Sequence, residues 1–464
     1  MNRASPRNMN TYRISGVPAD WGCEQLQSFL NDQETVTDAE IESLAYENNS
    51  KSQVATATFS NSPSQLQYSC SWSIPIPRAS NIKPNRKQYL TVGSDFHGFT
   101  TLYTPSSKDH KIDVIALSGL GGHAFGSFKE KDGSYMWLRD SLPYDLSSGT
   151  DNRPIARVMI YGYESTVAGS KSMQNLEDFA TKFNASLQTI VNAIKIRPII
   201  LIGHSLGGLI IKQALISLSG SENKDDQKLI QAVYGVVFFG TPHHGMEIGS
   251  LIPMVGDGPN RFLIESLNYS NSQILTIQHR DFHKALGGKG DSEVFCFYET
   301  LQSPTAQQDK FGAWKMTGPD AILVTKSSAI HCRPWEDGAE NICALNRTHS
   351  EMVKFKPNDS DYNIVKEKIK GLSRRALIAR GLANDINNDK CNKFGHSANG
   401  PRCYKCGEFG HFANDLHCYK CGGYGHYAND VHCDKCGGIG HYANDPHCYK
   451  CHAYGHFAKE CSMR

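Results

Sequence analysis

The chain has 464 residues, too many for one ordinary domain and compatible with two or three. Its apolar fraction of 39% is enough for a sizeable core. A formal net charge of +2 excludes a strong overall field for nucleic acid or acidic substrates, so any basic binding surface has to be local.

Cysteine is unevenly distributed, with five residues between Cys23 and Cys343 and ten in residues 391–464. The Cys-x2-Cys pairs with interleaved histidines predict metal ligands rather than disulfides, and therefore a reducing compartment. The N-terminal stretch is polar, and no apolar run approaches the length of a membrane span. We expect a cytoplasmic protein without signal peptide or transmembrane helix, with the nucleus as the alternative.

Residues 1–78 are predicted to form a small α+β domain. Expected strands cover 12–18, 39–46, 53–59 and 71–76, and expected helices cover 24–31 and 63–67. This order resembles an RNA-recognition motif. However, Arg13, Val54 and Thr56 occupy the positions where that motif has base-stacking aromatic residues. We therefore favour a structural, ferredoxin-like role.

Residues 79–110 carry turn signals and are expected to be a connector, followed by an α/β segment over 111–375. In this segment, apolar runs suited to burial on both faces alternate with helical patterns. The runs are IDVIALSG, RVMIYGY, RPIILIGHS, VYGVVFFGTP, EVFCFYET and AILVTKSSA. The alternation predicts a mostly parallel sheet covered by helices.

A G-x-S-x-G pattern at Gly203, Ser205 and Gly207 lies between an apolar run and a helical pattern. This is the setting of a nucleophile elbow, in which the serine sits in a strained turn and small neighbours let strand and helix approach. We predict Ser205 as a nucleophile, with the N–H of Leu206 as one oxyanion donor. The glycine-rich SGLGG run makes the N–H of Leu120 the expected second donor, unless its glycines serve packing alone.

A serine nucleophile needs a base and an orienting carboxylate, and along the chain the serine is followed first by the acid and then by the histidine. Glu299 closes the run EVFCFYE and is the favoured acid, with Asp257 and Asp281 as rivals. His349 follows the last apolar run at a plausible distance and is the favoured base. His331 is its main rival, whereas His243 and His244 precede the acid.

Several separated motifs, SGLGG, WLRDSLP, GHSLGG, FFGTPHHG, FYET and THSEMVKF, resemble a family of serine esterases. These are the N-terminal hydrolase domains of fungal NLR-like proteins, related to eukaryotic lipase-like and phosphatidylglycerol-remodelling proteins. The resemblance covers roughly residues 85–375. It implies an α/β-hydrolase fold, a triad of Ser205, Glu299 and His349, and an ester or lipid substrate, which leaves room for peripheral membrane contact.

Two alternatives stay open at this point. Residues 246–290 contain apolar helical pieces that suit either a cap over the site or ordinary packing. The chain as a whole is expected to be a serine hydrolase; the rival hypothesis is a catalytically silent hydrolase scaffold that binds RNA, single-stranded DNA or a protein through its C-terminal tail.

A polar linker is expected over 376–390, followed by repeats over 391–464. From Cys403 the sequence repeats every 15 residues, which is too short to hold a core of its own. The last unit fits the C-x2-C-x4-H-x4-C zinc knuckle, in which the metal supplies the folding energy. Its predicted Zn²⁺ ligands are Cys448, Cys451, His456 and Cys461.

The three preceding units lack the fourth cysteine, but each carries a histidine one position later. A histidine there can still close a tetrahedral site, although tandem duplication would also copy a neutral residue. The predicted ligand sets are Cys403, Cys406, His411 and His417; Cys418, Cys421, His426 and His432; and Cys433, Cys436, His441 and His447. A degenerate first unit from Cys391 is expected to be empty.

Zinc knuckles commonly bind single-stranded RNA or DNA through stacking and a few cations. Candidate stacking residues are Tyr404, Phe409, Tyr419, Tyr424, Tyr449 and Tyr454. Because aspartates nearly offset the lysines of the repeats, protein docking is the main competing hypothesis.

Overall fold

A computed structural model of the chain divides into two units, residues 1–386 and 387–464. The structure describes residues 10–382 except 34–35, 37, 48–50, 68, 78–86, 149–151, 192–196, 270–271, 288–290, 331–332 and 337. The predicted zinc ligands and stacking aromatic residues of the tail lie outside these residues, so the following description concerns the first unit.

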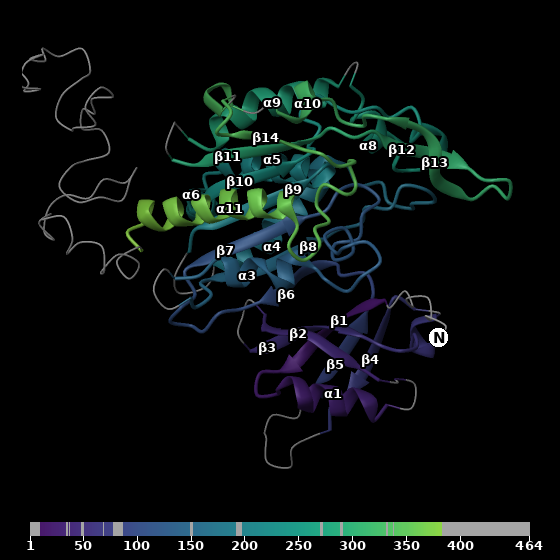
Figure 1. The fold of residues 1–464 in the computed structure, drawn as a ribbon, viewed down its shortest axis with the longest axis vertical. Coiled ribbons are helices and arrows are strands. Elements are labelled where there is room, and N and C mark those ends of the chain that lie inside the picture. The colour runs from purple at the N-terminus through teal and green to yellow at the C-terminus, as the bar shows by residue number, and fades with distance from the viewer. Residues whose placement is uncertain are drawn as a thin grey trace, which may run out of the picture. The chain divides into compact units, whose positions relative to one another are not determined.

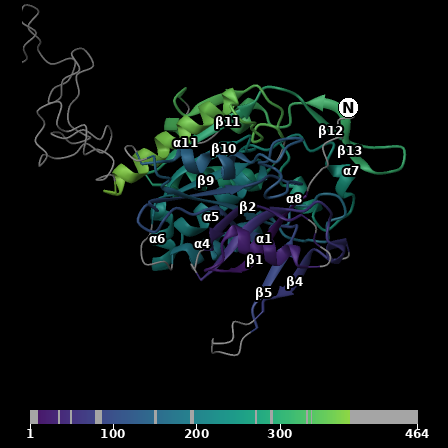
Figure 2. The same cartoon turned by 60° about the horizontal axis from the view of Figure 1, so that its bottom comes forward.

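The N-terminal domain is a sheet in the order β2-β3-β1-β5-β4, with one helix and one 3-10 turn. Its elements are β1 (Thr11–Pro18), α1 (Cys23–Asn31), β2 (Glu40–Tyr46), β3 (Ser52–Thr58), η1 (Ser64–Gln67), β4 (Ser71–Pro75) and β5 (Tyr89–Gly93). Figure 2 brings this domain forward. The expected strand–helix order is present, but the second helix is a single turn.

The segment expected to be a connector is partly folded. Strand β5 inserts between β1 and β4 of the N-terminal sheet, and β6 (Gly98–Tyr103) pairs antiparallel with β8 in the central sheet. The turn-forming residues of this segment flank both strands, which explains why composition alone predicted a linker.

The side chains at the positions of the base-stacking aromatic residues are engaged in contacts within the protein. Val54 and Thr56 are fully buried, and the guanidinium of Arg13 donates hydrogen bonds to the carbonyls of His97 and Phe99 at 2.7 and 2.9 Å. Because these side chains are used in packing and in the link to β6, the contacts favour a structural role for this domain.

The central sheet has the strand order β14-β11-β10-β9-β7-β8-β6, parallel throughout except at the β6 edge. The strands β7 to β11 are five of the apolar runs that the sequence predicts. Their bounds are β7 (Ile112–Leu117), β8 (Ala156–Gly162), β9 (Ile199–His204), β10 (Val233–Phe239) and β11 (Glu293–Glu299), with β14 (Ile342–Leu345) at the edge.

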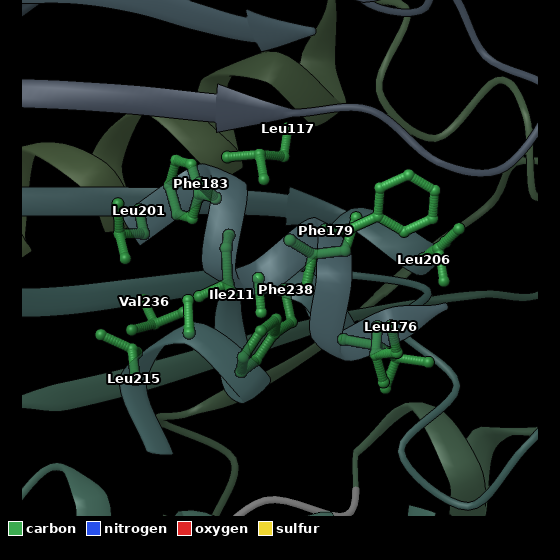
Figure 3. Packing of buried hydrophobic residues seen from close by; sticks show 14 of the residues in the cluster. Leu117, Leu176, Phe179, Phe183, Leu201, Leu206, Ile211, Leu215, Val236 and Phe238 are labelled. Carbon is green, nitrogen blue, oxygen red and sulfur yellow. The ribbon is translucent and has the colours of Figure 1, made fainter. Parts of the chain in front are cut away.

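Helices cover both faces of this sheet (Figure 1). One face packs against α4 (Leu176–Val191), α5 (Leu206–Ser219), α6 (Lys224–Ala232) and α9 (Gln273–Ala285). The other packs against α2 (Trp137–Asp140), α3 (Leu142–Asp145) and α11 (Ser360–Ala379). Figure 3 shows side chains of α4, α5 and the strands gathered on this face, among them Phe183, Ile211 and Leu201.

The prediction of a strand over AILVTKSSA is wrong. Strand β13 (Trp314–Ala321) ends at the first residue of this run. The last four residues of the run form α10 (Lys326–Ala329), whose N-cap Thr325 accepts the N–H of Ser328. The antiparallel hairpin of β12 (Ser303–Gln308) and β13 projects from the sheet edge (Figure 1). The remaining short elements are α7 (Ile252–Val255), α8 (Arg261–Glu265) and η2 (Pro334–Glu336).

Candidate active site

Ser205 lies in the tight turn between β9 and α5. Its backbone has φ 53° and ψ −123°, a conformation that side-chain-bearing residues rarely adopt. The neighbouring glycine is required by contact, because a Cβ on Gly207 would lie 2.5 Å from the carbonyl oxygen of Ser118. The Ser205 N–H donates to the carbonyl of Phe239 at 2.9 Å, which ties the turn to β10. This strained strand–turn–helix geometry is that of a nucleophile elbow.

His349 and Glu299 form a buried pair. His349 Nδ1 lies 2.5 Å from Glu299 Oε2, and the two side chains are only 8% and 0% exposed. The other oxygen, Glu299 Oε1, accepts the backbone N–H groups of Leu323 and Val324 at 3.0 and 3.1 Å. These donors orient the carboxylate toward His349. A carboxylate oxygen accepts, so Nδ1 carries the proton and Nε2 presents a lone pair.

The His349 residue is joined to the elbow through His204, the residue before Ser205. His204 Nε2 lies 2.9 Å from the His349 carbonyl oxygen, and the two rings are 5.0 Å apart. Burial, followed by the charge of His349, lowers the pKa of His204 to about 3, so this ring is neutral at physiological pH. Within the described residues, His349 Nε2 has no hydrogen-bond partner, as expected for a base awaiting a proton.

The glycine-rich loop after β7 lies directly against Ser205. A Cβ on Gly119 would lie 2.7 Å from Ser205 Cβ and 3.3 Å from Ser205 Oγ, so only glycine fits there. Gly121 N–H donates to the Ser165 carbonyl, whereas the Leu120 N–H has no backbone acceptor in the described part of the chain. Leu206 begins α5, so its N–H has no partner within the helix. Both amides can serve as donors to an oxyanion near Ser205.

The rival acids lie on the surface. Asp257 is fully exposed beside Arg261, and Asp281 pairs with the adjacent Arg280 on α9. Neither bonds to a histidine in the described residues. The structure thus brings Ser205, Glu299 and His349 to one edge of the sheet and leaves both rivals outside.

The rival bases do not join this group. His243 Nδ1 lies 3.2 Å from Lys212 Nζ, and His243 and His244 line a cavity of about 480 Å³ that is bounded by α9 rather than by the Ser205 turn. His331 lies outside the described residues. Sequence reasoning missed His204, whose polar side chain ends an otherwise apolar strand, and Ser303, for which the sequence carries no signal.

Residues 246–290 hold α7, α8 and α9. Helix α9 packs against α5 through the shared core, and Asn260 Nδ2 donates to the carbonyls of Thr166 and Val167 at 3.2 and 2.8 Å. These contacts pack the segment against the loop after β8.

Residues 148–256 match the sequence profile of a family described as "Putative serine esterase (DUF676)". Residues 401–415, 416–430 and 446–463 match the zinc knuckle. The chain carries a DUF676 domain followed by zinc knuckles. The matched part of the DUF676 domain contains the elbow with Ser205, and the last knuckle match contains Cys448, Cys451, His456 and Cys461. The two shorter matches end before His417 and His432, the proposed closing ligands.

The curated relatives of this chain include Protein SERAC1 from Mus musculus, 27% identical over 173 residues, or 34% of this chain and 26% of that protein. Protein SERAC1 from Bos taurus is 25% identical over 232 residues, or 46% of this chain and 34% of that protein. The chain therefore spans about a third or less of the length of these relatives.

The solved structures that resemble the chain include the mature lipase BlEst2 of Bacillus licheniformis, with 15% identity, 55% of this chain and 92% of that chain covered, and a TM-score of 0.32. Est1E from Butyrivibrio proteoclasticus is 12% identical, and the match covers 60% of this chain and 99% of that chain with a TM-score of 0.32. The expected α/β-hydrolase fold is confirmed, and in this chain it is defined by the parallel strand order and the elbow.

No helix among the described residues is long and apolar enough to span a membrane. The same residues contain no cluster of three or more histidine, cysteine or acidic side chains placed to bind a metal. The residues that match the zinc knuckle carry thiol and imidazole groups, the donors that Zn²⁺ prefers.

Proposed function

We propose that the DUF676 domain hydrolyses carboxylic esters, including lipid esters, through an acyl-enzyme on Ser205. The observation that carries the proposal is the buried Glu299–His349 pair, hydrogen-bonded to the residue that precedes a serine in a strained elbow. The same contacts leave His349 Nε2 without a hydrogen-bond partner among the described residues, as a general base requires.

The proposed reaction begins when His349 Nε2 takes the proton of Ser205 Oγ as this oxygen attacks the ester carbonyl carbon. The carbonyl oxygen becomes an oxyanion that accepts hydrogen bonds from the N–H groups of Leu120 and Leu206. Glu299 stabilises the imidazolium. The C–O bond to the alcohol then breaks, and His349 returns the proton to the leaving alkoxide. Water repeats the sequence on the acyl-enzyme and releases the carboxylic acid.

Labelling with a fluorophosphonate tests this proposal without knowledge of the substrate. The wild-type chain should be labelled on Ser205 and should hydrolyse p-nitrophenyl esters, and Ser205→Ala should lose both activities while its circular dichroism and unfolding midpoint stay the same. Wild-type-level labelling of Ser205→Ala would contradict the assignment, and a folded wild-type chain that does not react would favour the silent scaffold.

A second function is proposed for the tail, on the basis of its match to the zinc knuckle. The cysteines and histidines of each unit would hold Zn²⁺, and the tyrosines between them would stack on bases of single-stranded RNA or DNA. Fluorescence anisotropy of a labelled single-stranded oligonucleotide with the full chain tests this function. Binding should fall on addition of a zinc chelator and for a variant with Tyr449→Ala and Tyr454→Ala. Equal binding by that variant would exclude stacking in the last unit.

A further inference from the structure

The main chain of His349 is held on both sides by buried side chains. Its N–H donates to Ser303 Oγ at 2.9 Å, and its carbonyl oxygen lies 2.9 Å from His204 Nε2. Ser303 is 3% exposed and His204 is 6% exposed. Together with the side-chain bond to Glu299, these contacts give His349 three hydrogen bonds in directions that fix both its backbone and its ring.

The tautomer of His204 follows from its partner. A carbonyl oxygen can only accept, so Nε2 of His204 carries the proton and donates it to the bond. Its other nitrogen, Nδ1, is therefore an unprotonated acceptor, and it has no hydrogen-bond partner among the described residues. A Cβ on Gly119 would lie 3.2 Å from this Nδ1, which places the ring against the loop that carries the Leu120 amide.

His204 thus contacts three parts of the proposed machinery. It is covalently joined to Ser205, it donates to the backbone of His349, and it lies against the loop after β7. Its ring also lies 5.0 Å from the His349 ring, which becomes a cation during the reaction. A neutral ring at this place does not oppose that charge, whereas a protonated one would.

We propose that His204 and Ser303 are positioning residues that clamp the main chain of His349, so that its Nε2 stays aligned with Ser205 Oγ during proton transfer. This inference rests on the proposed esterase function and adds two residues to it. Neither residue exchanges a proton with the substrate. Their effect is on the placement of the base, where a misplacement of about 1 Å can cost roughly a hundredfold in rate.

The test compares wild type with His204→Leu, His204→Gln and Ser303→Ala, using a fluorophosphonate and p-nitrophenyl acetate. His204→Leu removes the donor, whereas glutamine can place an amide N–H near the position of the histidine Nε2–H. The quantities to measure are the fraction of sites that can be labelled, the labelling rate constant per labelled site, and kcat and KM.

We expect His204→Leu and Ser303→Ala each to lower kcat and the labelling rate constant by about tenfold or more, with KM nearly unchanged. His204→Gln should recover most of the loss. A merely structural role would lower the fraction of labelled sites and the unfolding midpoint and leave the rate constant per site unchanged; that result would overturn the proposal.

Two outcomes separate this inference from the function beneath it. A folded wild-type chain that is not labelled on Ser205 would refute the proposed hydrolysis itself. A reactive wild type with a Ser303→Ala variant of equal rate constant would refute only the clamp. Ser303 lies outside the elbow, so this variant decides the question even if His204→Leu does not fold.

Discussion

At the scale of single residues, the site depends on which oxygens and nitrogens are already occupied. Both oxygens of Glu299 accept hydrogen bonds, one from His349 and the other from two backbone amides. The carboxylate therefore cannot rotate without the loss of a hydrogen bond. This leaves the imidazole of His349 in the tautomer that can accept a proton from Ser205.

Glu299→Gln should reduce kcat by about three to four orders of magnitude, because an amide cannot hold that tautomer or stabilise the imidazolium. Hydrolysis of p-nitrophenyl acetate measures the effect. The matched controls are Asp257→Asn and Asp281→Asn, whose carboxylates pair with surface arginines and should be dispensable. An inactive Asp257 or Asp281 variant beside an active Glu299→Gln would show that the acid lies elsewhere.

Gly119→Ala should abolish most activity, because its methyl group would lie 2.7 Å from Ser205 Cβ and push either the serine or the Leu120 amide out of place. Loss of one oxyanion donor alone costs about a hundredfold to a thousandfold in kcat. Gly22→Ala is the control, since a Cβ there meets nothing within 4 Å. Comparable kcat values for the two variants would argue against a role of this loop in the site.

At the scale of elements, the orientation of the Glu299 carboxylate depends on the β12–β13 hairpin and the residues after it, which the sequence did not predict. Glu299 ends β11, and the β12–β13 hairpin follows it in the chain. The backbone N–H groups of Leu323 and Val324, just after the hairpin, donate to the Glu299 carboxylate. Ser303 at the start of β12 binds the backbone of His349. The two ends of the hairpin therefore both contribute to the site: Ser303 at its start binds His349, and the residues after its end bind Glu299.

The zinc tail is tested by metal content. The zinc content of the purified full-length chain measures it, and a loss of zinc when a tail ligand is replaced assigns that zinc to the tail. We expect about four zinc ions per chain if the histidine-closed units are competent, and about one if only the last unit is.

His432→Ala removes one proposed closing ligand and should lower the zinc count by about one or weaken one site roughly tenfold or more. Cys461→Ala is the matched change in the unit whose ligand pattern is complete. Mass spectrometry under non-denaturing conditions measures both. If the chain holds a single zinc and His432→Ala does not change this count, the three middle repeats do not bind zinc and act only as spacers.

At the scale of the whole molecule, a buried ion pair joins two strands of the central sheet. Asp113 on β7 accepts bidentate hydrogen bonds from Arg157 on β8 at 2.7 and 2.9 Å, and a further one from His110 at 2.8 Å. Burial by itself raises the pKa of Asp113, but the charge of Arg157 and the bonds from His110 and Arg157 outweigh it and hold the pKa at about 2.

This depressed pKa makes stability depend on acid. The contribution of Asp113 is complete above the pKa of the unfolded chain, near 4, and is lost as the pH falls from about 4 to 2, by roughly 2 kcal/mol. Asp113→Asn should flatten this part of the pH profile. At pH 7 it should lower the free energy of unfolding by about 3–5 kcal/mol, because the buried charge of Arg157 is then no longer offset by the Asp113 carboxylate.

Urea unfolding of both chains between pH 2 and 7 measures these differences. The control is Asp225→Asn, which removes an exposed pair with Lys228 and should change stability by about 0.5 kcal/mol or less. Parallel pH profiles for wild type and Asp113→Asn would contradict the assignment of the acid-sensitive step to this pair.

The sequence by itself determined the features that depend on neighbours along the chain. Burial on both faces requires continuous apolar runs, so β7 to β11 could be predicted from composition. The elbow could be predicted because its strand, turn and helix are adjacent in sequence and its glycines leave room for close approach. The place of Glu299 at the end of an apolar run then favoured it over Asp257 and Asp281, and chain order favoured His349 over His243 and His244.

Only the tertiary structure decided what depends on distant segments meeting. It paired Glu299 with His349 across 50 residues and joined His349 to His204 across 145. The run AILVTKSSA supplies amide donors to Glu299 and forms a capped helix instead of a strand. Strands β5 and β6 lie in two different sheets. A hydrogen bond between distant residues leaves no periodic pattern in the sequence, because its geometry is set by packing of the whole sheet rather than by local preference.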